Sequence, residues 1–151
     1  MTPLNHEMIK LSYTRVLKVE PTTADILAEL TKGYPFAYQV LGYLCYGKEI
    51  HPADDTFMDI LTEYDYYLQE FSYVKIWSEM SPMDRKVARV VAAGCHEAAK
   101  IQEQLGMDSK KYSVYRDRLK KKGLLDTRKY GEMHFSLPRF AEYINSKNCD
   151  D

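Results

Sequence analysis

A run of basic side chains is the strongest chemical signal in this sequence. The stretch Tyr112–Leu125, YSVYRDRLKKKGLL, carries five Lys or Arg side chains in fourteen residues, although the formal net charge of the whole chain is only −1. Clustered ammonium and guanidinium groups attract phosphates and other anions. The stretch therefore predicts either contact with a polyanion or a helix face that is simply solvated.

A second motif has part of the spacing of a phosphate-binding loop. The segment GYLCYGKE, residues 42–49, has the two glycines and the lysine, but Glu49 stands where Ser or Thr should reach magnesium. The segment also has the composition of an apolar helix. We therefore expect no phosphate-binding loop and no nucleotide hydrolysis by this chain alone.

The histidines and cysteines predict no metal site and no catalytic set. Cys95-His96-Glu97 could form one corner of a metal site, yet no second Cys/His pair stands at a finger-like spacing. His6, His51 and His134 are isolated in the sequence. We expect no metal, no catalytic residue and no enzymatic activity in this chain.

The charge of the chain is divided between its two halves. Residues 1–80 contain six basic and twelve acidic side chains, a net charge of −6, whereas residues 81–139 contain fourteen and seven, a net charge of +7. A Ser-Pro pair interrupts the helical pattern where the sign changes. We therefore predict two subdomains, residues 1–80 and residues 81–151.

The composition is that of a soluble globular protein. Hydrophobic residues make up 45% of the chain and charged residues 28%, so disorder is excluded, and no apolar run is long enough to span a membrane. The first residues lack the apolar core of a signal peptide. Three cysteines, Cys45, Cys95 and Cys149, are too few and too scattered for a disulfide framework. A cytoplasmic location is expected.

The basic half opens with a helix start. Ser81 can cap the helix, Pro82 suits its first position, and Asp84 places negative charge in its first turn. A second short helix is expected in EAAKIQEQLG. In the third helix, Tyr115 follows Tyr112 by three residues and Leu119 follows Tyr115 by four. This spacing predicts that the three side chains form one buried stripe.

After Gly123 the pattern changes to the alternation of strands. LLDT and EMHFSLP predict a hairpin joined by RKYG, followed by a last helix from Pro138. This order resembles a winged helix-turn-helix domain, and the resemblance is carried by IQEQLGMDSKKYSVYRDRLKKKGLLDTRKYGEMHFSLP. It implies a third helix in the DNA major groove and a hairpin on the phosphate backbone.

The resemblance and the predicted buried stripe together name the DNA-binding candidates. They are Lys110, Lys111, Ser113, Arg118 and Lys121 on the third helix, with Arg128 and Lys129 at the tip of the hairpin. Lysines mostly contact phosphate, so the pattern favours affinity over sequence specificity. Asp108 and Asp117 would repel phosphates, and docking of a partner protein remains the alternative use of this surface.

The acidic half predicts a small helical bundle. Helices are expected between Thr22 and Gly33, from Pro35 to Gly47, and from about Asp55 to Lys75, and the fold class is therefore mainly α. Residues Leu11 to Val19 alternate like one strand, which we interpret as the remnant of a link from a preceding domain.

The segment TKGYPFAYQVLGYL resembles the G-x-P motif in the helical lid of STAND-type P-loop ATPases of the AAA+ group. In that family the proline of the motif lies against the adenine of bound nucleotide. The resemblance therefore implies nucleotide contact at Pro35, with Gly33 opening the turn, and only in a longer parent protein that binds ATP or ADP.

A helical lid followed by a winged helix resembles the C-terminal part of such ATPases. The predicted function is a non-catalytic regulatory or recognition region whose winged helix binds DNA or docks a partner domain, with a nucleotide-binding domain upstream. Two alternatives stay open. One is a free-standing winged-helix transcription regulator whose acidic bundle dimerises or binds an effector; the other is a protein-interaction scaffold.

Overall fold

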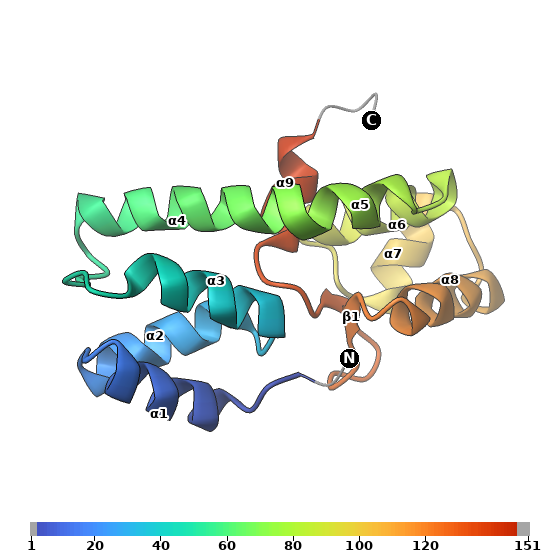
Figure 1. Ribbon diagram of the computed structural model, residues 1–151. Coiled ribbons are helices and arrows are strands. Elements are labelled where there is room, and N and C mark those ends of the chain that lie inside the picture. The colour runs from blue at the N-terminus through green and yellow to red at the C-terminus, as the bar shows by residue number, and fades with distance from the viewer. Residues whose placement is uncertain (1–2, 148–151) are drawn as a thin grey trace. The chain divides into compact units, whose positions relative to one another are not determined.

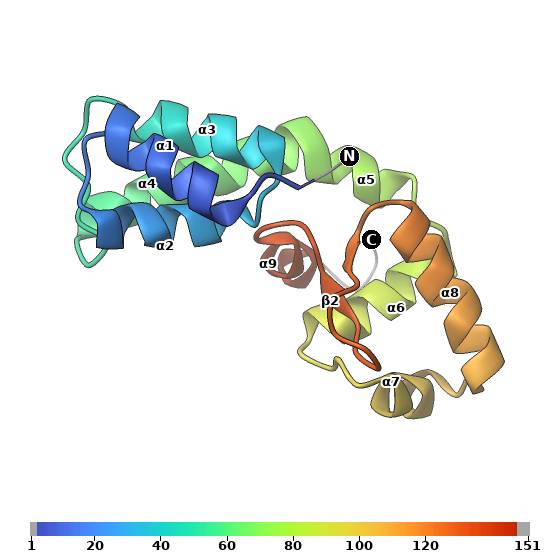
Figure 2. The ribbon, with the colours of Figure 1, turned by 90° about the horizontal axis from the view of Figure 1, so that it is seen from below.

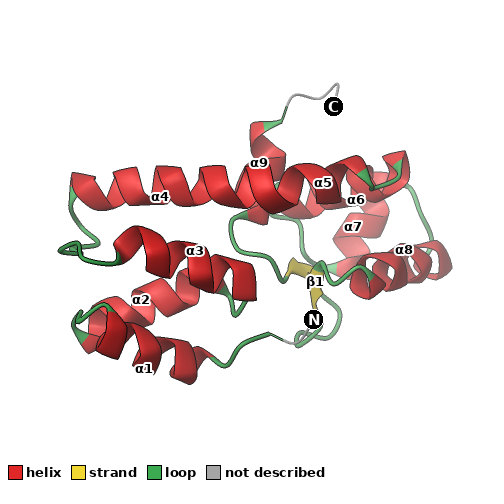
Figure 3. Cartoon of the chain, viewed as in Figure 1, coloured by secondary structure: helices red, strands yellow, loops and turns green. Residues whose placement is uncertain are grey.

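The computed structural model describes residues 3–147 and is mainly helical, as predicted, with one small antiparallel hairpin (Figures 1 and 3). The chain divides into two compact units, Met1–Ser72 and Tyr73–Asp151. None of the helices within the described residues is long and apolar enough to cross a membrane. Each unit is described below by itself.

The first unit is a bundle of four helices. They are α1 (His6–Val16), α2 (Pro21–Thr31), α3 (Pro35–Cys45) and α4 (Asp55–Leu68). Helix α1 packs on α2, and α3 lies beside α4 (Figure 1). Side chains that are fully buried between these helices include Leu27, Leu41 and Tyr64.

The predicted strand from Leu11 to Val19 is wrong, because most of this segment belongs to α1. Asn5 caps the helix, since its Oδ1 accepts hydrogen bonds from the backbone N–H groups of Glu7, at 2.9 Å, and Met8, at 3.2 Å. Ile9 and Tyr13, four residues apart, are both buried. Ile9 and Tyr13 would share a face in a strand as well, so their spacing does not decide between the two structures. The cap at Asn5 and the packing of this segment on α2 favour the helix.

A π-helical segment, η1 (Gln69–Tyr73), continues α4 into the short helix α5 (Val74–Ser78). The division between the two compact units falls inside this segment. It therefore lies earlier in the chain than the predicted boundary between Met80 and Ser81. Tyr73 explains the difference, because its ring is fully buried and lies 5.1 Å, centroid to centroid, from Phe140 of the second unit.

The second unit contains the remaining helices and the hairpin. They are α5, α6 (Pro82–Ala92), α7 (Ala98–Leu105), α8 (Ser109–Lys121), β1 (Leu125–Asp126), β2 (His134–Phe135) and α9 (Phe140–Ser146). Helix α6 lies against α7, α8 and α9 (Figure 2). The core of this unit includes Val87, Val91, Ile101 and Leu119, which are all nearly or fully inaccessible to solvent.

The start of α6 confirms the predicted cap. Ser81 Oγ accepts the backbone N–H of Asp84 at 3.1 Å, and Pro82 occupies the first turn. Strands β1 and β2 pair with Leu125 opposite Phe135. An isolated bridge between Glu97 and Glu132 attaches residues 96–98 to the hairpin. This small sheet holds the hairpin against the connection between α6 and α7.

Two of the cysteines lie in the described residues, and both are free thiols. Cys45 is buried at the end of α3, and burial raises its pKa to about 11, so the thiol stays protonated and unreactive at neutral pH. Cys149 lies outside the described residues.

Candidate nucleic-acid interface

Helix α8 buries one stripe and exposes the opposite one. Tyr112 and Leu119 are buried and Tyr115 is half-buried, as their spacing predicted. Asp108 fixes the first turn, because its Oδ1 accepts the backbone N–H of Lys111 at 2.8 Å. The side chain of Asp108, which would repel phosphate, thus serves in part as a helix cap.

The exposed side of α8 is mainly basic. Lys110 and Lys111 stand in its first turn and Lys121 at its end, and none of the three forms an ion pair within residues 3–147. Val114 is 53% exposed in the middle of the same helix. The exposed side chains of α8 include Lys110, Lys111, Ser113, Val114, Asp117 and Lys121.

Arg118 is an exposed candidate on α8 that is also paired with an acid. Its Nη2 donates a hydrogen bond to Oδ2 of Asp84 at 3.0 Å, and its guanidinium also lies 5.8 Å from the ring centre of Tyr115. The hydrogen bond to Asp84 raises the pKa of Arg118 above its usual range. Lys122, the residue that follows α8, approaches the same carboxylate oxygen at 3.9 Å, so two cations converge on one acid of α6.

Asp84 is fully buried. Its Oδ2 receives Arg118, whereas its Oδ1 makes no hydrogen bond with the residues that the structure describes. A buried carboxylate is stable only beside a compensating charge. Asp84 was expected only to favour the helix start; its role as anchor for α8 depends on a contact between distant parts of the sequence.

The tip of the hairpin carries the other two candidates. Arg128 forms a bidentate pair with Asp126, with Nη2 to Oδ2 at 2.6 Å and Nε to Oδ1 at 2.9 Å, while most of its side chain is exposed. Lys129 and Tyr130 are exposed beside it, Tyr130 completely. Asp126 thus orients Arg128 and offsets part of its charge, which leaves Lys129 as the more available cation of the tip.

The structure brings His134, which is isolated in the sequence, beside His96. The rings of His96 and His134 stack with centroids 4.1 Å apart. His96 Nδ1 lies 2.9 Å from the carbonyl oxygen of Met133, and His134 Nε2 lies 3.0 Å from Oε1 of Glu132. This hydrogen bond lowers the pKa of Glu132. No spacing in the sequence indicates the pair, because it depends on sheet pairing.

Another group of potential metal ligands lies on the first unit, among the described residues. His6, Glu7 and Asp25 place ligand atoms within 4.8 Å of one another. However, His6 Nε2 already lies 2.8 Å from Asp25 Oδ1, and Lys10 Nζ approaches the same oxygen at 3.8 Å. Because an ammonium group already neutralises part of this exposed cluster, we assign no metal to it.

Gly33 and Pro35, the nucleotide candidates, both have local structural roles. Gly33 has a positive φ of 74°, and its carbonyl accepts the backbone N–H of Leu4 at 2.7 Å. A Cβ atom at this position would lie 2.6 Å from the carbonyl oxygen of Leu4. Pro35 is the first residue of α3. The close backbone contact by itself requires glycine at position 33.

The first four residues of the segment that partly matched a phosphate-binding loop are helical, and residues 46–49 form the turn that follows. Residues 42–45 form the last turn of α3, and Leu44 and Cys45 are buried. A phosphate-binding loop instead follows a strand and presents backbone N–H groups to the ligand. The match is therefore a coincidence of spacing.

Comparisons with known proteins relate the chain to one family model and one solved structure. The model of a domain of unknown function (DUF8462) matches residues 71–144, which nearly coincide with the second compact unit. No curated protein matches the chain. The chain is similar to a Walker-type ATPase of Pyrococcus abyssi, with 16% identity and a TM-score of 0.68 over 95% of this chain and 42% of that chain.

This structural similarity shows a shared fold. The chain spans less than half of the length of the archaeal ATPase. A region with this fold therefore occurs within a larger P-loop ATPase.

Proposed function

We propose that the second unit is a winged helix-turn-helix module that binds DNA through α8 and the β1–β2 hairpin. We further propose that the chain is a non-catalytic regulatory or recognition region associated with a P-loop ATPase. The observation that carries the DNA proposal is the exposed basic side of α8, on a helix whose opposite side is anchored in the core.

The order of elements supports the winged-helix interpretation. Helix α6 leads into residues 96–98, then come α7, α8 and the hairpin. Residues 96–98 pair with the hairpin, because Met133 donates its backbone N–H to the carbonyl of His96 at 2.8 Å and Ala98 donates to that of Gly131 at 3.0 Å. A helix, a short strand, two helices and a two-stranded wing are the parts of such a domain.

The charges support phosphate contact by lysine rather than base reading by arginine. Lys110, Lys111 and Lys121 are exposed and carry no ion pair in the described chain, whereas Arg118 and Arg128 are held by Asp84 and Asp126. Lysine contacts to phosphate provide affinity that depends strongly on salt and little on sequence. Ser113 and Lys129 would add contacts at the helix and at the wing tip.

The similarity to the archaeal ATPase supports the second part of the proposal. The chain covers less than half of that protein, and its own partial match to a phosphate-binding loop begins inside α3 instead of following a strand. We therefore expect no ATP hydrolysis by this chain. Gly33 and Pro35 would meet ATP or ADP only where a partner nucleotide-binding domain supplies the phosphate site.

Fluorescence anisotropy with a labelled random-sequence DNA duplex tests the DNA proposal on the whole chain. With about four phosphate contacts, the logarithm of the association constant should fall against the logarithm of salt concentration with a slope of roughly −3.6. Replacing Lys110, Lys111 and Lys121 with Ala should weaken binding and reduce the slope by about 2 to 3.

A control with the same charge change separates this surface from general electrostatics. Lys18, Lys48 and Lys75 are exposed lysines outside α8 and the hairpin, and their triple replacement with Ala should leave the slope nearly unchanged. Equal weakening by the two triple variants would contradict the assignment of α8. Absence of binding at low salt would reject DNA as the partner and favour docking of a protein on this surface.

A further inference from the structure

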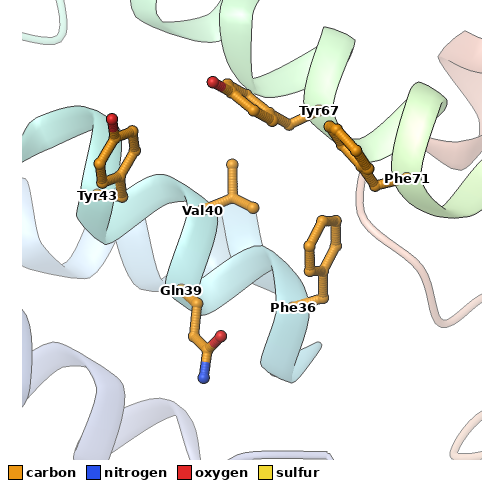
Figure 4. Close-up of a pocket in the computed structure, with 6 residues that line it drawn as sticks. All are labelled: Phe36, Gln39, Val40, Tyr43, Tyr67 and Phe71. Carbon is orange, nitrogen blue, oxygen red and sulfur yellow. The ribbon is translucent and has the colours of Figure 1, made fainter.

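An apolar groove lies between α3 and α4 in the first unit. It has a volume of about 320 Å³ and is lined by Phe36, Gln39, Val40, Tyr43, Tyr67 and Phe71 (Figure 4). The first four residues belong to α3, Tyr67 to α4 and Phe71 to the π-helical segment η1. All of these residues lie in one compact unit, so the groove does not depend on the second unit.

Two of the four aromatic side chains of the groove are unusually exposed. Phe71 is 66% and Tyr43 74% accessible, although large apolar surfaces normally leave water on folding. The rings of Tyr67 and Phe71 stack with centroids 5.8 Å apart and an interplanar angle of 20°, which forms a preassembled wall. A rigid aromatic wall that is already ordered costs little entropy when a partner covers it.

The same face of α4 becomes acidic toward its N-terminal end. Asp59, Glu63, Tyr67 and Phe71 follow one another at intervals of four residues. Successive residues at this spacing are neighbours on adjacent helical turns, so the four side chains form a slowly winding stripe, and twelve residues of helix rise about 18 Å. The stacking of Tyr67 on Phe71 keeps the two aromatic side chains adjacent across the start of η1.

A second hollow, of about 560 Å³, surrounds the acidic end of this stripe. The carboxylates of Glu49, Asp54, Asp59 and Glu63 line it, and Lys48 is the only basic side chain other than His51 among its lining residues. Four carboxylates against one ammonium leave a negative potential there. An occupant that covers both hollows must therefore be apolar at one end and cationic at the other.

We propose that the α3–α4 face, defined by these two hollows, docks a basic amphipathic helix of a partner protein. The length of about 18 Å spanned by the stripe exceeds a small cation and matches about three turns of helix. Bulky apolar side chains of that helix would cover the aromatic hollow. Lys or Arg side chains two to three turns further along would meet Glu63 and Asp59.

This proposal is independent of DNA binding, because its residues belong to the first unit and the DNA candidates belong to the second. Its partner is a protein segment, recognised by apolar contact and by charge. Failure of DNA binding would therefore leave it unaffected, and its own failure would leave the DNA interface unaffected.

The experiment uses designed helical peptides of about eighteen residues, long enough to span the stripe. The probe is an acetylated, fluorescently labelled Ala/Gln peptide with leucines at its third and seventh positions and lysines at its eleventh and fifteenth. One twin carries glutamates in place of both lysines, and another carries glutamines in place of both leucines. Binding to the whole chain is measured by fluorescence anisotropy.

The lysine peptide should bind at least about tenfold more tightly than either twin. Phe71→Ser should weaken its binding by about tenfold, and because Phe71 is exposed the fold should be retained, which circular dichroism checks. Glu63→Lys should weaken the lysine peptide and strengthen the glutamate twin. This exchange of preference is the decisive readout, because general loss of structure would weaken both peptides.

Two matched variants on the second unit serve as controls. Tyr130→Ser removes an aromatic ring that is fully exposed, and Glu103→Lys reverses another exposed carboxylate, so neither should change the affinity for the lysine peptide. No binding of the lysine peptide at roughly 1 mM, or equal binding of the lysine and glutamate peptides, would overturn the proposal. Sedimentation equilibrium that shows a dimer lost in Phe71→Ser would instead assign the groove to a second copy of this chain.

Discussion

Arg118 on α8 donates a hydrogen bond to Asp84 on α6 at 3.0 Å, and this contact joins an exposed basic helix to a fully buried carboxylate. The pair fixes the rotation of α8 about its own axis from the outside, while Tyr112 and Leu119 fix it from the core. Arg118 therefore has mainly a structural role. The lysines on the exposed side of α8 are left as the principal cations for a ligand.

Arg118→Ala should mainly lower the stability of the protein, and its effect on DNA affinity should be small. It removes the hydrogen bond from a buried carboxylate that Lys122 approaches only at 3.9 Å, and an unpaired buried charge is costly. We expect a decrease in Tm of several degrees by circular dichroism. Lys121→Ala, at an exposed position on the same helix, should show the reverse, with unchanged Tm and weaker DNA binding. Identical profiles for the two variants would contradict this division of roles.

Gly33→Ala should be far more destabilising than Gly47→Ala. Both glycines have a φ near 75°, which costs an alanine about 1–2 kcal/mol. Only at Gly33 would the new Cβ overlap the backbone oxygen of Leu4, whereas nothing lies within 4 Å at Gly47. The overlap should add about 1–3 kcal/mol to the loss of unfolding free energy. Urea denaturation of the two variants measures the difference, and equal losses would refute a tight contact between Leu4 and Gly33.

A fragment of residues 69–151 should fold, and a fragment of residues 81–151 should be severely destabilised. The shorter fragment lacks Tyr73 and Trp77, which are at most 4% exposed. Tyr73 packs on Phe140 and Tyr143, and the indole of Trp77 lies 5.1 Å from the guanidinium of Arg89. Loss of two buried aromatic side chains at about 3–5 kcal/mol each approaches the whole stability of a small domain.

Thermal unfolding followed by circular dichroism distinguishes the two fragments. The longer one should show a cooperative transition, and the shorter one a much lower Tm or none. Equal transitions would place the boundary between the units after Met80, where the charge pattern alone predicted it.

The carboxyl of Glu132 should make the second unit less stable in acid. Its hydrogen bond to His134 lowers its pKa from the ordinary value of 4.5, so the folded state binds a proton less readily than the unfolded chain. The stabilisation is therefore present above about pH 4.5 and is lost as the pH falls through the lower pKa of the folded state. Lys129 and His96 also lower this pKa.

The measurement is Tm between about pH 5 and pH 3 for the wild type and for Glu132→Gln. The difference in Tm between the two proteins should shrink as the pH falls. Glu103→Gln, which changes an exposed carboxyl on α7, is the control and should show no such convergence. A constant difference between wild type and Glu132→Gln would mean that the ionised carboxylate does not stabilise the fold.

Several local features followed from the sequence because short-range interactions determine them. Ser81 and Pro82 start α6 through contacts within one turn, and the spacing of Tyr112 and Leu119 fixes which side of α8 is buried. The mainly helical class follows from such patterns repeated along the chain. The division into an acidic and a basic half is a property of composition and needs no coordinates.

The tertiary structure decided the features that depend on distant partners. Residues Leu11 to Val19 alternate like a strand, yet the cap at Asn5 and packing on α2 make α1 helical. The sequence contains no sign that Asp84 meets Arg118, that His96 stacks on His134, or that Tyr73 belongs with Phe140. Such contacts form only when packing brings separate helices and strands together, because local hydrogen bonding and side-chain periodicity carry no information about which distant residue will be the neighbour.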